Sequence, residues 1–347
     1  MSNKYKIAVL FGAAHGINDF IAGYLLANLS VHSTNWQLNT MAFLGYSLLA
    51  FGGQLPAGLL VDKFKQIKKF SLFALALLIL SISVSGFSVI TAIVISGIAS
   101  AFIHVCGGAA CFVSDNKSNT LAGIFTSPGV IGLILGGIVG ALQFDYFYVF
   151  MIPLVLLFFW LLKIQLSDYT FIEQQKQDSL LETHDFFMLI LLFAIAMRSM
   201  FWNLLHMMCF DNNQWLIGLG AAAAIGKLAG GFLADKLYWK NWVLFSIIGA
   251  VVLLNAGKNS FPVFCLGVAL LQSAVPVTLV LMQNYLQKSP ATAAGLSLGI
   301  AILLAGIPTY FEQFRIAQQQ ISFIVLLSIV FLVSNFWFIR NSKKTLV

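Results

Sequence analysis

Three polar residues lie within about one helical turn near the start of the chain, inside an otherwise apolar segment. His15 and Asp19 are four residues apart, and Asn18 directly precedes Asp19. On a helix, residues four apart share one face, so the imidazole and the carboxylate can meet. Burial and a neighbouring imidazole act on a carboxylic acid in opposite directions, which suits such a pair to taking up and releasing a proton. We expect Asp19 to be a proton-coupling carboxylate with His15 as its partner; the alternative is a structural pair that fixes this helix against a neighbour.

Two cationic residues, Arg198 and Lys227, also fall within apolar segments. A charge at the centre of a bilayer costs about 2.5–3.5 kcal/mol on insertion scales, so a charged residue within a span is a candidate functional residue. Together with Asp19, the two cations leave one positive charge in excess, and arginine can hold a carboxylate or phosphonate through two parallel hydrogen bonds. We therefore expect a small-molecule substrate that is anionic or amphiphilic. The alternative is that the cations pair with Asp19 or extend to the membrane interface.

Three further polar residues complete the expected substrate contacts: Asn18, His104 and Gln283. His104 has the alternative role of a hydrogen-bonded packing residue, and Gln283 that of a hydrogen bond between helices. The four cysteines lie in apolar segments without the spacing of a metal or redox site. We expect no metal, no cofactor and no catalytic residue.

Long apolar segments must position these side chains. Of the 347 residues, 60% are apolar and 9% are charged, and the mean hydropathy is +0.92. Soluble domains are about 45–50% apolar and about 25% charged, so this composition excludes an ordinary water-soluble protein. Twelve spans of about 20 residues would use about 240 residues and leave about 107 for loops and tails. The composition therefore predicts a helical protein that crosses the lipid bilayer many times on short loops.

The apolar runs predict twelve membrane spans. The expected spans are Ile7–Leu29, Met41–Val61, Phe70–Phe87, Ile90–Val113, Leu121–Leu142, Tyr148–Leu162, Phe186–Phe210, Trp215–Ala234, Trp242–Ala256, Pro262–Leu286, Ala293–Phe311 and Ile321–Phe338. The first span carries polar residues and lacks the clean apolar stretch of a signal peptide, so we expect it to remain uncleaved.

The positions of lysine and arginine predict the orientation. With twelve spans and a cytoplasmic N-terminus, fifteen of the nineteen basic residues lie on the cytoplasmic side: Lys4, Lys6, Lys63, Lys65, Lys68, Lys69, Lys117, Lys163, Lys176, Lys236, Lys240, Lys288, Arg340, Lys343 and Lys344. This asymmetry follows the positive-inside rule and predicts that both termini are cytoplasmic. Topology thus explains the formal charge of +7, and we expect no nucleic-acid partner.

The sequence contains an internal repeat. Residues 53–64 and 226–237 are identical at six of twelve positions, at an offset of 173 residues, which is half the chain. A second echo at nearly the same offset pairs Thr120–Gly123 with Thr292–Gly295. We therefore expect two six-helix halves, residues 1–165 and 185–347, joined by a cytoplasmic linker at 166–184. Parallel halves with a solute site between them are a known transporter architecture.

The repeated Gly-x-x-x-Asp-Lys resembles the cytoplasmic loop signature of the major facilitator superfamily of transporters. The matching residues are Gly58, Asp62 and Lys63 in the first half and Gly231, Asp235 and Lys236 in the second. The resemblance implies the major facilitator fold, an all-α membrane fold of twelve transmembrane helices in two pseudo-symmetric halves. It also implies that this element stabilises one face of the alternating-access cycle. Lys65 departs from the family pattern, which usually has glycine there.

Further segments resemble the fosmidomycin-resistance-type facilitators within that superfamily. They are His15-x-x-Asn18-Asp19, Gly97–His104, Thr126–Gly140, and Pro276–Leu286 followed by Ala294–Gly299, with Val105 where those proteins have proline. In the glycine-rich stretch, Gly129, Gly132, Gly136 and Gly140 share a helix face and predict a close-packing seam. Antiporters of the superfamily carry a comparable element in the fifth span, which favours export.

These observations favour a secondary active transporter that moves a small organic solute by alternating access, with proton-coupled efflux as the expected mode. A proton-coupled uptake symporter is the alternative within transport. A polytopic membrane enzyme and a transport-dead sensor are further alternatives. The sequence lacks the sizeable extramembrane domain expected of such an enzyme. The charged residues Asp19 and Arg198 within the spans disfavour the sensor. We expect a monomer in the cytoplasmic (inner) membrane of a bacterium.

Overall fold

The computed structural model describes residues 2–143, 147–166, 183–209, 212–257, 260–306 and 321–341, and these are helices joined by short turns. Helices form because the apolar runs are long and because a chain in lipid must satisfy its backbone hydrogen bonds within each segment. The expected linker 166–184 lies almost wholly outside the described residues. Within them, the all-α fold class is confirmed.

Among its described residues, the first half comprises seven α-helices and two short irregular helices. They are α1 (Asn3–His32), α2 (Trp36–Ser47), the π-helix η1 (Leu48–Gly52), α3 (Gln54–Phe64), α4 (Ile67–Ser85), α5 (Val89–Ser114), α6 (Asn119–Ala141), the 3-10 helix η2 (Phe147–Phe150) and α7 (Met151–Lys163). The segments α2, η1 and α3 together make the second predicted span.

The second half is divided more often. Its elements are α8 (Thr183–Cys209), α9 (Asn213–Leu237), α10 (Trp239–Ala256), α11 (Phe261–Gln272), α12 (Val275–Tyr285), α13 (Pro290–Ala294), the π-helix η4 (Gly295–Ile300), α14 (Ala301–Gly306) and α16 (Ile321–Asn341). The tenth predicted span is interrupted at Ser273 and Ala274, and the predicted end of the eleventh extends beyond Gly306, outside the described residues.

The predicted spans match the helices. Among the described residues, nine segments are long and apolar enough to cross a membrane, and three shorter apolar helices cover Tyr148–Lys163, Pro290–Gly306 and Ser328–Trp337. Each of the twelve predicted spans overlaps one of these twelve segments. Large apolar side chains such as Phe87 and Phe232 are exposed on the outside, as expected of a surface that faces lipid.

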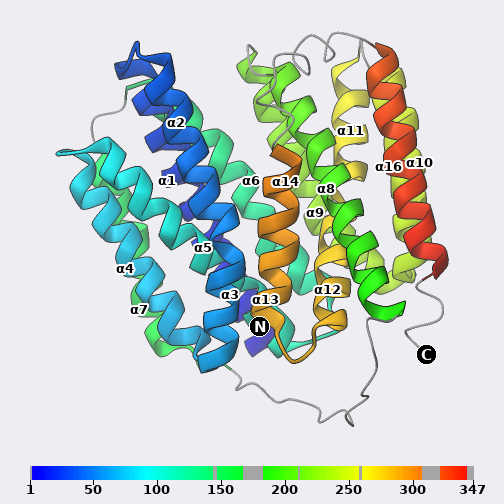
Figure 1. Cartoon of the computed structure of the whole chain (residues 1–347), viewed down its shortest axis with the longest axis horizontal. Coiled ribbons are helices and arrows are strands. Elements are labelled where there is room, and N and C mark those ends of the chain that lie inside the picture. The colour runs from blue at the N-terminus through cyan, green and yellow to red at the C-terminus, as the bar shows by residue number, and fades with distance from the viewer. Residues whose placement is uncertain are drawn as a thin grey trace.

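The two halves lie side by side (Figure 1), with α1–α7 on one side and α8–α16 on the other. Each half has its own apolar core, and each core takes side chains from the other half. Leu279, Ala291 and Leu298 belong to the core of the first half, whereas Ile134 belongs to that of the second. The halves are therefore joined through α6, α12, α13 and η4.

Glycines allow α1 and α6 to pack backbone against backbone. A Cβ atom on Gly132, Gly136 or Gly140 would overlap the carbonyl oxygen of Gly16, Phe20 or Tyr24, respectively. Small residues permit such close approach, which favours helix association in lipid through van der Waals contact. This packing holds the polar face of α1 against α6.

We expect Gly136→Ala to destabilise the protein by about 1–3 kcal/mol, the usual cost of inserting a methyl group into a well-packed interior. Gly137 is the matched control because a Cβ atom there meets nothing within 4 Å. Its replacement by alanine should leave stability unchanged or raise it by up to about 1 kcal/mol through helix propensity. Thermal unfolding in detergent measures the stability of both variants. Equal melting temperatures would contradict close packing of α1 against α6 at Gly136.

Candidate functional site

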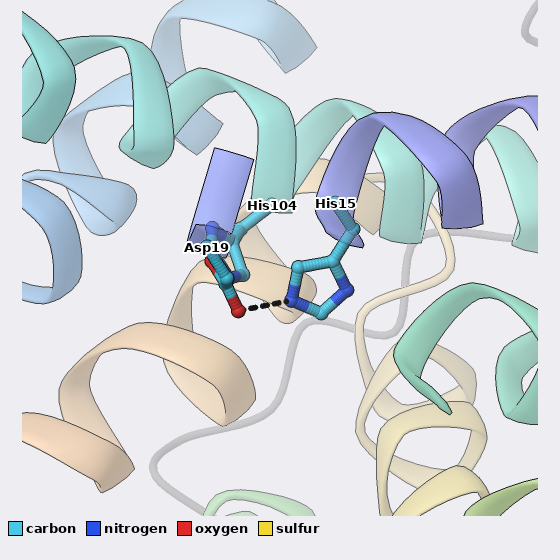
Figure 2. Close-up of side chains that lie close together, drawn as sticks. All are labelled: His15, Asp19 and His104. Carbon is cyan, nitrogen blue, oxygen red and sulfur yellow. Dashed lines mark ion pairs between the residues drawn. The ribbon is translucent and has the colours of Figure 1, made fainter. Parts of the chain in front are cut away.

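The structure brings His15, Asp19 and His104 together, although His104 lies on a different helix (Figure 2). The Nε2 atom of His15 is 3.1 Å from one carboxylate oxygen of Asp19, and that of His104 is 3.8 Å from the other. The two imidazole rings meet edge to face, with centroids 4.5 Å apart. Both histidines are buried, and the Asp19 side chain is 16% exposed. We call these three residues the Asp19 cluster.

Both imidazoles in the Asp19 cluster direct the same nitrogen towards the carboxylate. The Nδ1 atom of His15 lies 3.0 Å from the Phe125 carbonyl oxygen, and that of His104 lies 2.8 Å from the Ser100 carbonyl oxygen. A carbonyl oxygen only accepts, so each Nδ1 atom carries a hydrogen. Each Nε2 atom then faces an acceptor-only carboxylate, and this contact is attractive only with a proton or a metal ion between the two groups.

Neighbouring residues orient Asp19. The Asn18 amide donates to Asp19 at 2.8 Å and to the Ser100 hydroxyl at 3.0 Å. Asn18 therefore contacts the carboxylate directly. Its side-chain oxygen, Oδ1, is buried without a hydrogen-bond partner. Gly129 of α6 packs directly against the His15–Asp19 pair, because a Cβ atom there would overlap the His15 ring and lie 2.7 Å from the Asp19 carboxylate. Gly129 thus leaves room for the His15–Asp19 pair.

Arg198 on α8 is a buried cation with a neutral partner. Its side chain is 3% exposed, and its guanidinium donates to the Thr278 hydroxyl of α12 at 3.0 Å. Within the described residues, no carboxylate lies within ion-pair distance of Arg198 or Lys227, so neither cation pairs with Asp19. Because a guanidinium has five N–H donors, most of the hydrogen-bonding capacity of Arg198 is left for a ligand.

Lys227 and Gln283 each donate a hydrogen bond to the other half. The Lys227 ammonium lies 3.4 Å from the Thr126 carbonyl oxygen of α6. The Gln283 amide donates to the Gly108 carbonyl oxygen of α5 at 2.9 Å. For Gln283 this is the hydrogen bond between helices that the structural alternative predicts.

Asp62 joins the halves at the end of the bundle where α3 ends and α13 begins. Its carboxylate accepts hydrogen bonds from the backbone N–H groups of Ala291 and Thr292, at 3.1 and 2.7 Å, and from the Thr292 hydroxyl at 2.6 Å. A carboxylate at a helix N-terminus satisfies free N–H groups and is favoured by the helix dipole.

Asp235 makes the symmetry-related contact, where α9 ends and α6 begins. Its carboxylate accepts from the backbone N–H groups of Asn119 and Thr120, both at 2.9 Å, and from the Thr120 hydroxyl at 2.6 Å. The Asn119 amide adds a further hydrogen bond at 2.8 Å. We call the contacts of Asp62 and Asp235 the inter-half clamps.

The remaining motif residues surround the clamps. A Cβ atom on Gly58 would lie 2.6 Å from the Ala291 carbonyl oxygen, and one on Gly231 would overlap that of Asn119, so both glycines permit the contact between halves. Lys63 and Lys236 are exposed, and each ammonium lies 5.7 Å from the ring of a neighbouring phenylalanine, Phe64 and Phe232 respectively.

Lys65 ends α3 in a left-handed conformation, with φ of 56°. Glycine adopts this conformation without strain, which gives a physical reason for the glycine that the family carries at this position. Tyr238, at the equivalent place after α9, has φ of 67°. Both repeats therefore end at a residue with positive φ, but only Lys65 has the left-handed helical conformation, because ψ is 31° there and 114° at Tyr238.

Asp115 lies near the Asp235 clamp, but in the described part of the chain its carboxylate bonds to residues of its own half. Its carboxylate accepts hydrogen bonds from the Lys4 ammonium at 2.8 Å and from the Lys117 backbone N–H at 3.2 Å. Partial burial raises the pKa of Asp115, but these hydrogen bonds and the two positive charges outweigh burial, so the pKa lies below its usual value.

Sequence reasoning missed Ser100, Thr278 and the carbonyl group of Phe125. Ser100 and Thr278 lie inside segments that resemble facilitators, but small hydroxyl residues are common in membrane helices. The contact of Phe125 is made by its backbone, which no residue type reveals. Only three-dimensional packing identifies these partners.

No protein-family model and no curated protein matches the sequence. The fold, however, is similar to solved structures. A variant of the Escherichia coli fucose:proton symporter FucP has a TM-score of 0.73 at 12% identity, covering 98% of this chain and 99% of that one. FucP in the outward conformation has a TM-score of 0.72 at 14% identity, covering 96% and 97%.

The human organic anion transporter MFSD10 (TETRAN) has a TM-score of 0.68 at 15% identity, with 97% of this chain and 100% of that chain covered. At these identities the likeness shows the fold, which is that of major facilitator superfamily transporters. The expected twelve-helix fold class is therefore confirmed over nearly the whole chain.

Proposed function

We propose that this protein is a secondary active transporter of the major facilitator superfamily. It moves a small organic solute across the membrane by rocking its two halves around a central site. The observation that carries the proposal is the pair of inter-half clamps, since two equivalent aspartates hold the two halves together at one end through hydrogen bonds that can be broken. The twelve-helix fold and its transporter neighbours support it.

The proposal places the clamps at the cytoplasmic end, following the distribution of lysine and arginine. With the clamps formed, the cytoplasmic side is closed and the solute site faces the other side. Breaking the clamps lets the halves separate there. The similarity to FucP in the outward conformation is consistent with this assignment.

The proposed coupling ion is the proton, taken up at the Asp19 cluster. The support is the arrangement of donors and acceptors, in which two Nε2 atoms face one carboxylate and a proton makes each contact attractive. Neutralising this buried charge would favour the conformational change, because an isolated charge is costly in a low-dielectric interior. The printed description of FucP as a proton symporter is consistent with proton coupling in this fold.

Export by antiport is the proposed direction, and uptake by symport is the alternative. The resemblance of Thr126–Gly140 to facilitators that confer fosmidomycin resistance favours export. FucP, a symporter with the same fold, keeps the alternative open. The sign of the proton movement that accompanies solute flux decides between the two.

The proposed substrate is a small acidic molecule held by Arg198. A buried guanidinium with one neutral partner is well placed to bind a carboxylate through two parallel hydrogen bonds. Lys227 adds a second positive charge on the same half. MFSD10, which shares the fold, is described as an organic anion transporter.

Arg198→Ala is expected to weaken the binding of an acidic substrate about 10–100-fold, as a charge-assisted hydrogen bond contributes about 1.5–3 kcal/mol. Arg198→Lys should recover part of this loss, because lysine keeps the charge without the planar pair of donors. The readout is the half-saturating concentration for the acidic compound that gives the largest transport signal in the wild type. Arg340→Ala, at the exposed end of α16, is the control. Full affinity in Arg198→Ala would count against an anionic substrate.

A further inference from the structure

We propose that His15, Asp19 and His104 bind a first-row divalent transition metal ion, for which zinc is the probe. The spacing of these residues along the chain does not indicate a metal site, because His104 lies far from the other two. The structure brings one potential ligand atom from each residue within 4.8 Å of the others. Metal binding goes beyond the proposed transport function and does not depend on it.

The distances between the ligand atoms suit a tetrahedral ion. Zinc binds imidazole nitrogen and carboxylate oxygen at about 2.0–2.2 Å, so neighbouring ligand atoms in a tetrahedron are about 3.3–3.6 Å apart. In the Asp19 cluster, the His15 Nε2 atom is 3.1 Å from one carboxylate oxygen of Asp19 and the His104 Nε2 atom is 3.8 Å from the other. Taken as one atom from each residue, the three ligand atoms lie within 4.8 Å of one another. Small side-chain rotations bring all three atoms to one ion.

The surroundings of the ligands are those of a metal site. A histidine that binds a metal donates its other ring N–H to a carbonyl or carboxylate, which fixes the ring and leaves the free nitrogen for the ion. His15 and His104 both do so, towards Phe125 and Ser100. The Asn18 amide holds the carboxylate of Asp19 in the same way. All three ligand side chains are thus oriented before an ion binds.

The ligand types select the class of ion. Two imidazole nitrogens and one carboxylate oxygen suit zinc, iron, cobalt or nickel, whereas magnesium and calcium need mainly oxygen ligands. Three protein ligands leave one position open, as in catalytic zinc sites. An anion in that position would balance the second positive charge of the ion.

The test is zinc binding to the full-length protein, purified in detergent and stripped of metal by a chelator. Calorimetry should give one zinc ion per chain. His104→Gln should weaken binding more than about 100-fold, because losing a ligand costs at least as much as losing one of its outer hydrogen-bond partners. His32→Gln, which alters an exposed histidine at the end of α1, is the matched control and should bind as the wild type does. Cobalt provides a second readout, since its visible spectrum reports nitrogen and oxygen ligands in a four-coordinate site.

Thermal unfolding of each variant shows whether it is folded. Zinc should raise the melting temperature of the wild type and of His32→Gln but not that of His104→Gln. Unchanged zinc affinity in folded His104→Gln, or no binding to the folded wild type, would overturn the proposal. Because no step requires transport, failure here leaves the proposed function standing, and a transport failure leaves metal binding testable.

Discussion

Replacing Asp19 with asparagine is expected to reduce pH-gradient-driven solute flux to background while the protein still folds and inserts. Asparagine keeps the size of aspartate and one acceptor oxygen, but it cannot take up a proton or face His15 as an anion. Exchange of solute down its own gradient should persist, because rocking of the halves does not need the driving force. The measurement compares driven flux and exchange in proteoliposomes, with a chelator present so that metal ions do not contribute.

Asp115→Asn is the matched control for this experiment. It removes a carboxylate that is hydrogen-bonded to a cation, as Asp19→Asn removes one that faces an imidazole, but at a contact outside the Asp19 cluster. Driven flux should therefore survive in Asp115→Asn. If the Asp19→Asn protein retained flux driven by the pH gradient, Asp19 would be a structural residue that fixes α1 against α5 and α6.

The second large effect is expected from the inter-half clamps. Combining Asp62→Asn with Asp235→Asn removes the charge from both aspartates, which together accept hydrogen bonds from Ala291, Thr292, Asn119 and Thr120. A hydrogen bond to a charged group contributes about 1.5–3 kcal/mol, so losing even one such contribution shifts the conformational equilibrium at least tenfold towards separation at that end.

Distances between spin labels measure this shift. Suitable positions are Gln66 and Lys288, which are exposed in the turns after α3 and α12, in a background without native cysteines. The wild type should give a short distance and the double variant a longer one. Asp115→Asn again serves as the control, since its ion pair lies within one half. An unchanged distance in the double variant would show that the clamps do not hold the halves together.

Much of the fold could be predicted from the sequence because lipid imposes simple rules. Each apolar run had to form a helix, so each of the twelve predicted spans overlaps an apolar helix among the described residues. The irregular segments were not predicted. The π-helices Leu48–Gly52 and Gly295–Ile300 lie where the second and eleventh spans meet, and hydropathy does not distinguish a π-helix from an α-helix.

The contacts of the inter-half clamps could not be predicted from the sequence. Both echoes were recognised, the one that contains Asp62 and Asp235 and the one that begins at Thr120 and Thr292. Their connection was not, because each aspartate contacts the threonine of the opposite half, more than a hundred residues away. A repeat reveals equivalent positions but not which of them touch.

The candidate site was predicted in part for a similar reason. The spacing of His15 and Asp19 within one helix was enough to place them together. The approach of His104 and the orientation of the His15 ring by the Phe125 carbonyl depend on how α1, α5 and α6 pack, whereas the Ser100 carbonyl that orients His104 lies one turn earlier on α5 itself. Those contacts add His104 to the predicted pair and so complete the three-residue Asp19 cluster.

The measurement that tests the central claim most directly is substrate-dependent proton movement in proteoliposomes that contain a pH-sensitive dye. A panel of acidic and amphiphilic compounds is applied to the wild type under an imposed gradient. The account predicts that at least one acidic compound drives proton flux opposite to its own movement, and that Asp19→Asn abolishes the signal. Proton flux in the same direction as the solute would instead establish the symporter. Formation of a product without flux, or solute flux that moves no protons, would contradict a proton-coupled transporter.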